Sequence, residues 1–215
     1  VEHLKGKKPC IAHIAAADLT TSIKLARHAE RVGCDCVAAI PPVFFHYTED
    51  DVFNYYRAIS EAVSIPVMVY YHPAAGMQMS ARFFAKLFTI DNIKAVKWSK
   101  RDYYEMLLLK DITQGDMNIL NGPDETLLCG LAAGADGGIG TTYNFLLPIY
   151  RILYQEFVAG NMDAARQAQF AANRIINVAL EHPIIPVTKL VLRSMGFDVG
   201  EATAPMMRFD TETGQ

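Results

Sequence analysis

The sequence predicts an α/β fold with a parallel sheet, and three observations support this. Short apolar runs rich in β-branched residues alternate with longer segments of helical period, which is the pattern of successive βα units. No glycine-rich phosphate fingerprint follows the first expected strand, and polar or reactive residues gather where the expected strands end. Active sites of (β/α)8 barrels lie at such strand ends, so the sequence favours a barrel over an open doubly wound sheet.

Six βα units follow one another along the chain, and only helices come after them. We expect strands at residues 10–16, 35–40, 66–71, 93–97, 117–120 and 137–140. We expect helices at residues 21–32, 49–63, 81–88, 101–112, 124–133 and 143–159. The first three should begin at Thr20 or Thr21, at Thr48 and at Ser80, because hydroxyl side chains cap helices well. From Met162 onward, Pro183 and Pro186 should break the helical sequence into about two pieces.

Six strands leave an eight-stranded barrel unclosed. The two open edges would expose unpaired backbone groups, which soluble proteins avoid. We therefore predict a (β/α)8 TIM barrel that lacks its first two βα units here. Residues 1–160 are predicted to form barrel units three to eight, and residues 161–215 a C-terminal helical extension of the same domain.

The composition is that of an ordinary globular protein with a small-molecule ligand. The 215 residues are 51% hydrophobic and 20% charged, enough for one large domain with a sizeable core. The net charge of −3 gives no electrostatic reason to propose nucleic acid or an anionic membrane as a partner. No apolar run approaches the roughly 20 residues that span a bilayer, and the four cysteines lack metal-binding spacing. We expect a soluble cytoplasmic protein with free thiols.

Lys97 ends an expected strand whose other residues are mostly apolar. At the mouth of a barrel its amine would lose water, and burial disfavours the charged form of an amine. A neutral lysine amine attacks ketones. The alternative is a lysine that merely reaches solvent, as we expect for Lys94 and Lys100, and the pattern alone does not choose between the two.

The strand before the lysine strand ends in Tyr70, Tyr71 and His72. Consecutive strands are neighbours in a parallel barrel, so these side chains should lie beside Lys97. A tyrosine hydroxyl in that place could shuttle a proton to or from a substrate oxygen. The alternative is that the tyrosines only pack and that His72 only holds a loop.

Two further loops carry polar or glycine-rich sequence. Asp124 and Glu125 follow a strand end and open a helix, where they either complement the helix dipole or accept hydrogen bonds from a polyol. Residues 134–144 contain four glycines and the hydroxyl of Thr141. Such a run lets backbone amides approach a ligand closely, although a tight strand-to-helix turn would also need some of these glycines.

Together, and in this order, these segments resemble the pyruvate-dependent class I aldolases, the family that contains N-acetylneuraminate lyase and dihydrodipicolinate synthase. The similarity covers essentially the whole chain and includes residues 13–14, 41–45 and 183–189. It implies a (β/α)8 barrel with extra C-terminal helices, usually a homotetramer, with no metal or organic cofactor. It also implies that Lys97 forms the Schiff base. Within a Tyr-x-x-Pro motif it implies that Tyr70 is the proton shuttle, with Tyr71 as the alternative.

The lyase branch of the family is the more similar one. Synthases carry an arginine in the loop after the Tyr-x-x-Pro motif, where residues 73–76 have none, and Phe44 and Phe45 lack the synthase's tyrosine hydroxyl. The family's Gly-x-x-Gly-Glu motif, which binds the carboxylate of pyruvate, is absent and is expected before residue 1. The resemblance to the lyase implies substrate-binding roles for Ser99, Gly122, Asp124, Glu125, Gly140 and Thr141.

The leading hypothesis is therefore a Schiff-base aldolase that cleaves N-acetylneuraminate, or a related 2-keto-3-deoxy sugar acid, to pyruvate and an aldehyde sugar. One alternative is a synthase-like or dehydratase activity on another keto acid. Another is a relative that binds a sugar acid without catalysis.

Overall fold

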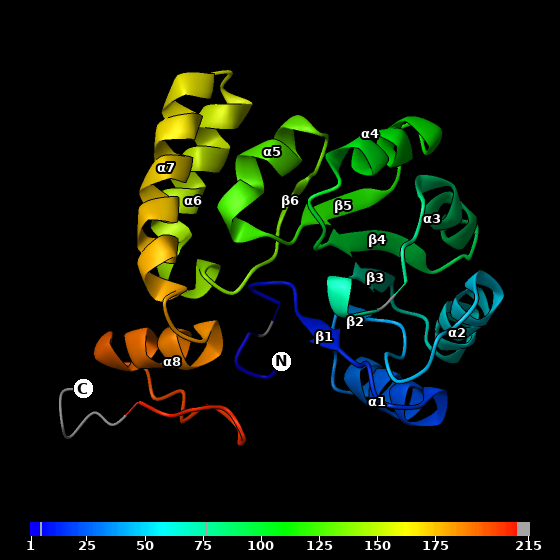
Figure 1. Ribbon diagram of the computed structural model, residues 1–215. Helices are drawn as coiled ribbons and strands as arrows, with labels where there is room; N and C mark the ends of the chain where they lie inside the picture. The colour runs from blue at the N-terminus through cyan, green and yellow to red at the C-terminus, as the bar shows by residue number, and fades with distance from the viewer. Residues whose placement is uncertain (5, 76, 210–215) are drawn as a thin grey trace. The chain divides into compact units, whose positions relative to one another are not determined.

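The frame of the molecule is a set of short parallel strands in chain order, seen in a computed structural model that describes residues 1–4, 6–75 and 77–209 (Figure 1). The chain divides into two compact units. The first comprises residues 1–122 and 133–136, and the second comprises residues 123–132 and those from 137 onward. The predicted α/β class is confirmed, and the described residues contain six strands in the predicted order.

The first unit contains five strands that lie side by side in the order in which the chain makes them. Each neighbouring pair is parallel. A doubly wound sheet reverses its strand order at a switch point, and these five strands do not reverse. Their order is consistent with part of a TIM barrel. They are β1 (Ile11–His13), β2 (Cys36–Ala39), β3 (Val67–Tyr71), β4 (Ile93–Trp98) and β5 (Asn118–Asn121).

Helices cover one face of these strands, as Figure 1 shows. They are α1 (Leu19–Arg31), α2 (Glu49–Ala62), α3 (Ala81–Phe88) and α4 (Tyr103–Ile112), and a short 3-10 helix, η1 (Pro73–Ala75), follows β3. The core between helices and strands contains Val69, Tyr71 and Trp98 from the strands and Phe84 from α3, all at most 2% exposed. This buried layer fixes which face of each strand remains for polar residues.

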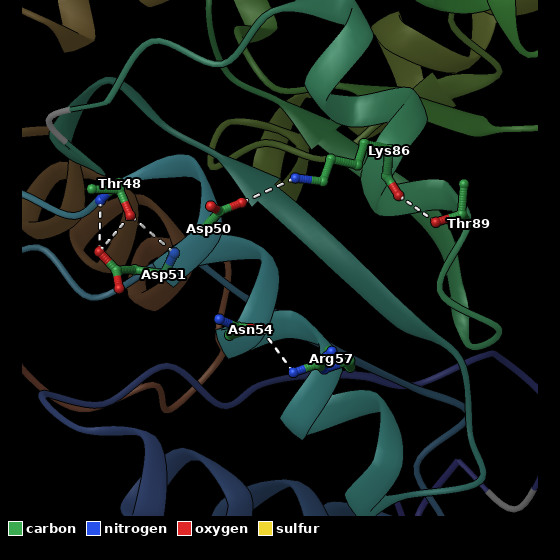
Figure 2. A network of polar contacts seen from close by, with 7 residues as sticks. All are labelled: Thr48, Asp50, Asp51, Asn54, Arg57, Lys86 and Thr89. Carbon is green, nitrogen blue, oxygen red and sulfur yellow. Dashed lines mark hydrogen bonds and ion pairs between the residues drawn. The ribbon is translucent and has the colours of Figure 1, made fainter.

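Two helix starts in the first unit follow the prediction, and one differs. Thr48 caps α2 in a reciprocal box with Asp51, and Figure 2 shows this box together with the ion pair between Lys86 and Asp50, 3.1 Å long. Ser80 caps α3 as predicted. The prediction of Thr20 or Thr21 for α1 was wrong, because Asp18 starts the helix earlier and accepts a hydrogen bond from the N–H of Thr21 (2.8 Å).

The second unit is mostly helical and has its own hydrophobic core, built around Leu127, Leu146, Leu153 and Ile176. The prediction that Pro186 breaks the last helices was wrong. Pro186 lies in the first turn of the final helix, where the N–H that proline lacks has no intrahelical partner anyway. The elements are η2 (Asp124–Thr126), α5 (Leu127–Ala132), β6 (Gly137–Gly138), α6 (Tyr143–Val158), α7 (Met162–Ala179) and α8 (Ile184–Ser194).

Among the described residues, no single helix is long and apolar enough to cross a membrane. Only α7 and α8 taken together meet that test of length and composition, and the pair is bent by 107°. Two statements stay predictions: that the barrel has two further βα units ahead of those described, and that a helical extension begins after residue 160.

Replacing Thr48 with alanine should lower the free energy of unfolding of the first unit by about 1 kcal/mol, because α2 loses its N-terminal cap. Trp98 is the only tryptophan in the chain and is fully buried in this unit. Its fluorescence during urea denaturation therefore measures the change. The control is Arg57→Ala on the same helix, whose side chain is 54% exposed, and it should change stability by less than about 0.5 kcal/mol. Equal effects of the two substitutions would contradict the capping argument.

Candidate active site

Lys97 and Tyr70 are directly opposite each other on neighbouring parallel strands, β4 and β3. Residues in register on parallel strands present their side chains to the same face. The Nζ atom of Lys97 accordingly lies 4.1 Å from the centre of the Tyr70 ring, within the range of a cation–π contact. Both side chains are only partly buried. The predicted nucleophile and the predicted proton shuttle are thus brought together.

Tyr71, the alternative proton shuttle, points to the opposite face of β3. Its ring packs against Trp98 and Phe84, with ring centres about 5.0 Å apart in each pair. Its hydroxyl accepts a hydrogen bond from the N–H of Met79 (3.2 Å). Because Tyr71 is only 2% exposed and committed to the core, the geometry favours Tyr70 as the residue beside the lysine.

Ser99 and Gly122 lie next to each other just beyond the ends of β4 and β5. The backbone N–H of Gly122 donates to the carbonyl of Trp98 (2.7 Å). A Cβ atom at Gly122 would lie 2.0 Å from Oγ of Ser99, so only glycine permits this approach. The structure thus brings together two of the predicted substrate-binding residues, each one position past a strand end.

His13 and His72 also lie in the site; the sequence placed His72 beside Lys97 without fixing its role, and it gave His13 none. The ring centres of His13 and Tyr70 are 5.8 Å apart, those of His72 and Tyr70 are 5.4 Å apart, and each imidazole is nearly perpendicular to the phenol. His72 follows Tyr70 by two residues, and strand side chains repeat on one face every two residues. That spacing was the available signal for His72. For His13 there was none, because it lies two strands away on β1.

The pKa of each of these two imidazoles is below its ordinary value. Loss of water around the ring is the larger cause in both cases, and the positive charge of Lys97 is the second. Both causes disfavour the imidazolium form. The two rings of His13 and His72 are therefore neutral at neutral pH.

In the second unit, Asp124 is a buried carboxylate that fixes the turn between β6 and α6. Its Oδ2 atom accepts hydrogen bonds from the N–H (2.6 Å) and the hydroxyl (2.7 Å) of Thr142, the residue before α6. A Cβ atom at Gly140 would lie 1.3 Å from the other carboxylate oxygen of Asp124. Gly140 is thus required by the position of Asp124, a packing reason that the sequence did not reveal.

Glu125 and Thr141 lie beside Asp124 and Thr142 in sequence but remain partly exposed. The carbonyl of Glu125 accepts a hydrogen bond from the side chain of Asn173 on α7 (3.0 Å). Burial raises the pKa of Tyr143 and of Tyr150 far above the ordinary value, and the charge of Asp124 adds to the effect in both.

In the described part of the chain, no three His, Cys, Asp or Glu side chains gather to form a metal site.

Comparison with known proteins identifies the family of this chain. Residues 1–215 match the dihydrodipicolinate synthetase family. The chain belongs to this family. Among curated members, the N-acetylneuraminate lyase of Rhizobium meliloti (strain 1021) is 30% identical over 205 residues, which are 95% of this chain and 68% of that protein.

Two solved structures show the same fold. The catalytic lysine mutant of Ruminococcus gnavus sialic acid aldolase has a TM-score of 0.92 and 33% identity, and the match covers 97% of this chain and 70% of that one. A putative dihydrodipicolinate synthetase from Pseudomonas aeruginosa has a TM-score of 0.92 and 27% identity, over 98% of this chain and 73% of that one. The chain spans 66–70% of the length of the curated relatives that it matches.

Replacing Lys97 with methionine should raise the pKa of both His13 and His72 toward the ordinary value of about 6.5. The substitution removes the positive charge, whereas the larger contribution from lost water remains, so the rise should be partial. NMR titration of the imidazole resonances measures it. Lys94→Met, which replaces an exposed lysine of the same strand, should leave both values unchanged.

The same lowered pKa values predict how stability depends on pH. The unfolded chain binds protons at these histidines more readily than the folded protein, so the free energy of unfolding should fall as the pH drops through about 6.5. Unchanged histidine pKa values in the Lys97→Met protein would contradict the geometry described above.

Proposed function

We propose that this protein is a Schiff-base aldolase that cleaves N-acetylneuraminate, or a closely related 2-keto-3-deoxy sugar acid, to pyruvate and an aldehyde sugar. The observation that carries the proposal is the amine of Lys97 above the ring of Tyr70, at the carboxyl ends of two parallel strands. The family and the lyase relatives support it. One matched aldolase is described as having a catalytic lysine, which agrees with a lysine-dependent reaction.

In the first stage the amine of Lys97 attacks the C2 ketone of the substrate, and water leaves to give an imine. A protonated imine draws electrons from the carbon chain, which splits a difficult bond cleavage into easier steps. His13 and His72, neutral at neutral pH, add no positive charge beside the reacting amine.

In the second stage the bond between C3 and C4 breaks, and its electrons move toward the iminium nitrogen. The proton of the C4 hydroxyl must leave as the aldehyde forms, and Tyr70 relays it: the phenol oxygen takes this proton as its own proton passes on, and one proton is returned at C3. Protonation at C3 and hydrolysis then release pyruvate and regenerate Lys97. The common face of Tyr70 and Lys97 supplies the proximity that such a proton transfer needs.

Substrate-binding roles for Ser99, Gly122, Asp124, Glu125, Gly140 and Thr141 belong to this proposal. In the first unit, Ser99 follows Lys97 by two residues, the spacing of side chains that share a face, and its hydroxyl lies beside Gly122, so it suits a contact with the sugar acid. In the second unit, the burial of Asp124 and its bonds to Thr142 favour a scaffolding role. Glu125 and Thr141 are more open to solvent, and a carboxylate such as Glu125 accepts hydrogen bonds from hydroxyls.

The proposal extends to assembly and location. A homotetramer follows from the family resemblance alone. The four cysteines are free thiols, which agrees with a reducing compartment such as the cytoplasm.

Incubation with pyruvate and sodium borohydride should attach the pyruvate carbons to Lys97 by reduction of the imine. Peptide mapping by mass spectrometry identifies the labelled lysine. Lys97→Met should abolish the label and reduce release of pyruvate from N-acetylneuraminate by at least about 10⁴-fold, because the covalent route is lost. Lys94→Met is the matched control, since Lys94 is exposed on the same strand, and it should keep both label and activity.

Two results would contradict the proposal. A label on another lysine, or none, would reject Lys97 as the nucleophile. A labelled protein that releases no pyruvate from N-acetylneuraminate or other 2-keto-3-deoxy sugar acids would favour the synthase-like or dehydratase alternative. Binding of the sugar acid with neither label nor turnover would favour the non-catalytic relative.

Replacing Tyr70 with phenylalanine should lower kcat for cleavage by about 10²- to 10⁴-fold, because the general base is removed while the ring is kept. Tyr71→Phe serves as the control. It removes a core hydroxyl that holds the N–H of Met79, so it should lower stability by about 1–3 kcal/mol and leave kcat nearly unchanged. Steady-state kinetics and urea denaturation measure the two effects. A larger loss of kcat in Tyr71→Phe would reassign the shuttle.

A further inference from the structure

Two histidines lie beside the ring of Tyr70, the proposed proton shuttle. His13 comes from β1, and His72 lies one residue past the end of β3. Beside the face contact of Lys97 at 4.1 Å, the Tyr70 ring meets His13 at 5.8 Å with an 84° angle between ring planes. It meets His72 at 5.4 Å with an angle of 81°. Perpendicular arrangements at these distances are the preferred geometry of aromatic pairs. Three side chains therefore contact the phenol ring of Tyr70 and define its position: Lys97 from β4, His13 from β1 and His72 from the end of β3.

The contact of His13 across an intervening strand depends on a small residue. His13 on β1 is in register with Ala38 on β2, and Ala38 is in register with Met68 on β3, two residues before Tyr70. Alanine presents only a methyl group to this face. The imidazole of His13 can therefore reach over β2 to the Tyr70 ring, which a larger side chain at position 38 would prevent.

His72 reaches the same ring from the other direction along the chain. It lies just past the end of β3, two residues after Tyr70 and one before the short helix η1. Since side chains two residues apart share a face of a strand, His72 stands beyond Tyr70 toward the open end of the site. The pKa of both imidazoles is lowered by lost water and by Lys97, so neither ring carries a charge that would compete with Lys97 for the face of the phenol.

We propose that His13 and His72 are positioning residues that hold the ring of Tyr70 in line with Lys97, so that its hydroxyl meets the substrate as the carbon–carbon bond breaks. They act through the shape and orientation of their rings and transfer no proton themselves. This inference rests on the proposed aldolase function, and it assigns to the reaction two residues that neither the family match nor the sequence pattern assigned.

The test compares alanine and phenylalanine at each position. His13→Ala and His72→Ala should each lower kcat for cleavage of N-acetylneuraminate by about 10-fold or more, since displacement of a catalytic group by about 1 Å can cost 10²-fold. KM should change by less than about twofold. His13→Phe and His72→Phe keep an aromatic ring and should stay within about threefold of the wild type. His28→Ala, on the exposed surface of α1, is the control and should have no effect.

A double-mutant cycle shows whether the histidines act through Tyr70. In a Tyr70→Phe background, His13→Ala or His72→Ala should cost less than about threefold in kcat, because the hydroxyl that they position is already gone. Where alanine prevents folding, as judged by Trp98 fluorescence, leucine replaces it and fills the space without an aromatic ring.

Several results would overturn the inference. Full activity of both alanine variants would show that the contacts are dispensable. Phenylalanine variants as poor as alanine variants would show that an imidazole nitrogen is needed, and a raised KM with unchanged kcat would indicate substrate binding instead. Borohydride trapping of pyruvate on wild-type Lys97 distinguishes failure of the proposed function from failure of the positioning role. Absence of trapping would reject the proposed function itself. Trapping that persists alongside unaltered kcat in the variants rejects only the positioning role.

Discussion

The candidate active site depends on the register between two parallel strands. Tyr70 on β3 pairs with Lys97 on β4, and this pairing decides which side chains share a face. A shift of one residue would move Tyr71 to the lysine and bury Tyr70 instead. The core resists such a shift, because Tyr71 and Trp98 pack against Phe84 on α3. Burial of large aromatic side chains on the outer face thus fixes the polar pair on the inner face.

The second unit uses a different constraint for its polar residues. Asp124 is buried, and it compensates the cost of losing water with hydrogen bonds to Thr142. Its position leaves no room for a side chain at Gly140. The carbonyl of Asp124 also accepts hydrogen bonds from Tyr150 and Gln169, so one residue ties together η2, α6 and α7. A segment predicted to bind substrate therefore also serves as a structural junction, and Glu125 and Thr141 are positioned by it.

The sequence was sufficient where one local signal determines structure. Ser80 and Thr48 start their helices as expected, and the lysine strand begins at Ile93 as expected, although it ends at Trp98, one residue later. It was insufficient where two signals compete: Asp18 precedes two threonines as a cap, and Pro186 is compatible with a first helical turn as well as with a break. Tyr70 and Tyr71 are adjacent and chemically alike, so only the position of the core separates them. Contacts across a strand, such as that of His13 with Tyr70, have no local signal.

The inner face of the sheet can carry this chemistry because the outer face supplies the packing. Val67, Val69, Val96 and Ile119 are fully buried on the helix side, and burial of such side chains stabilises the strands by roughly 1.5–3 kcal/mol for each residue. The opposite face is then free of that demand. It accommodates a lysine, a tyrosine and two histidines at close range, which an apolar core would exclude. Ala38 illustrates the division: on the inner face its small size stabilises little, yet it leaves the space through which His13 reaches Tyr70. The geometry of the site thus depends on small residues such as Ala38, whose size leaves space for larger side chains, as well as on the residues proposed to take part in the reaction.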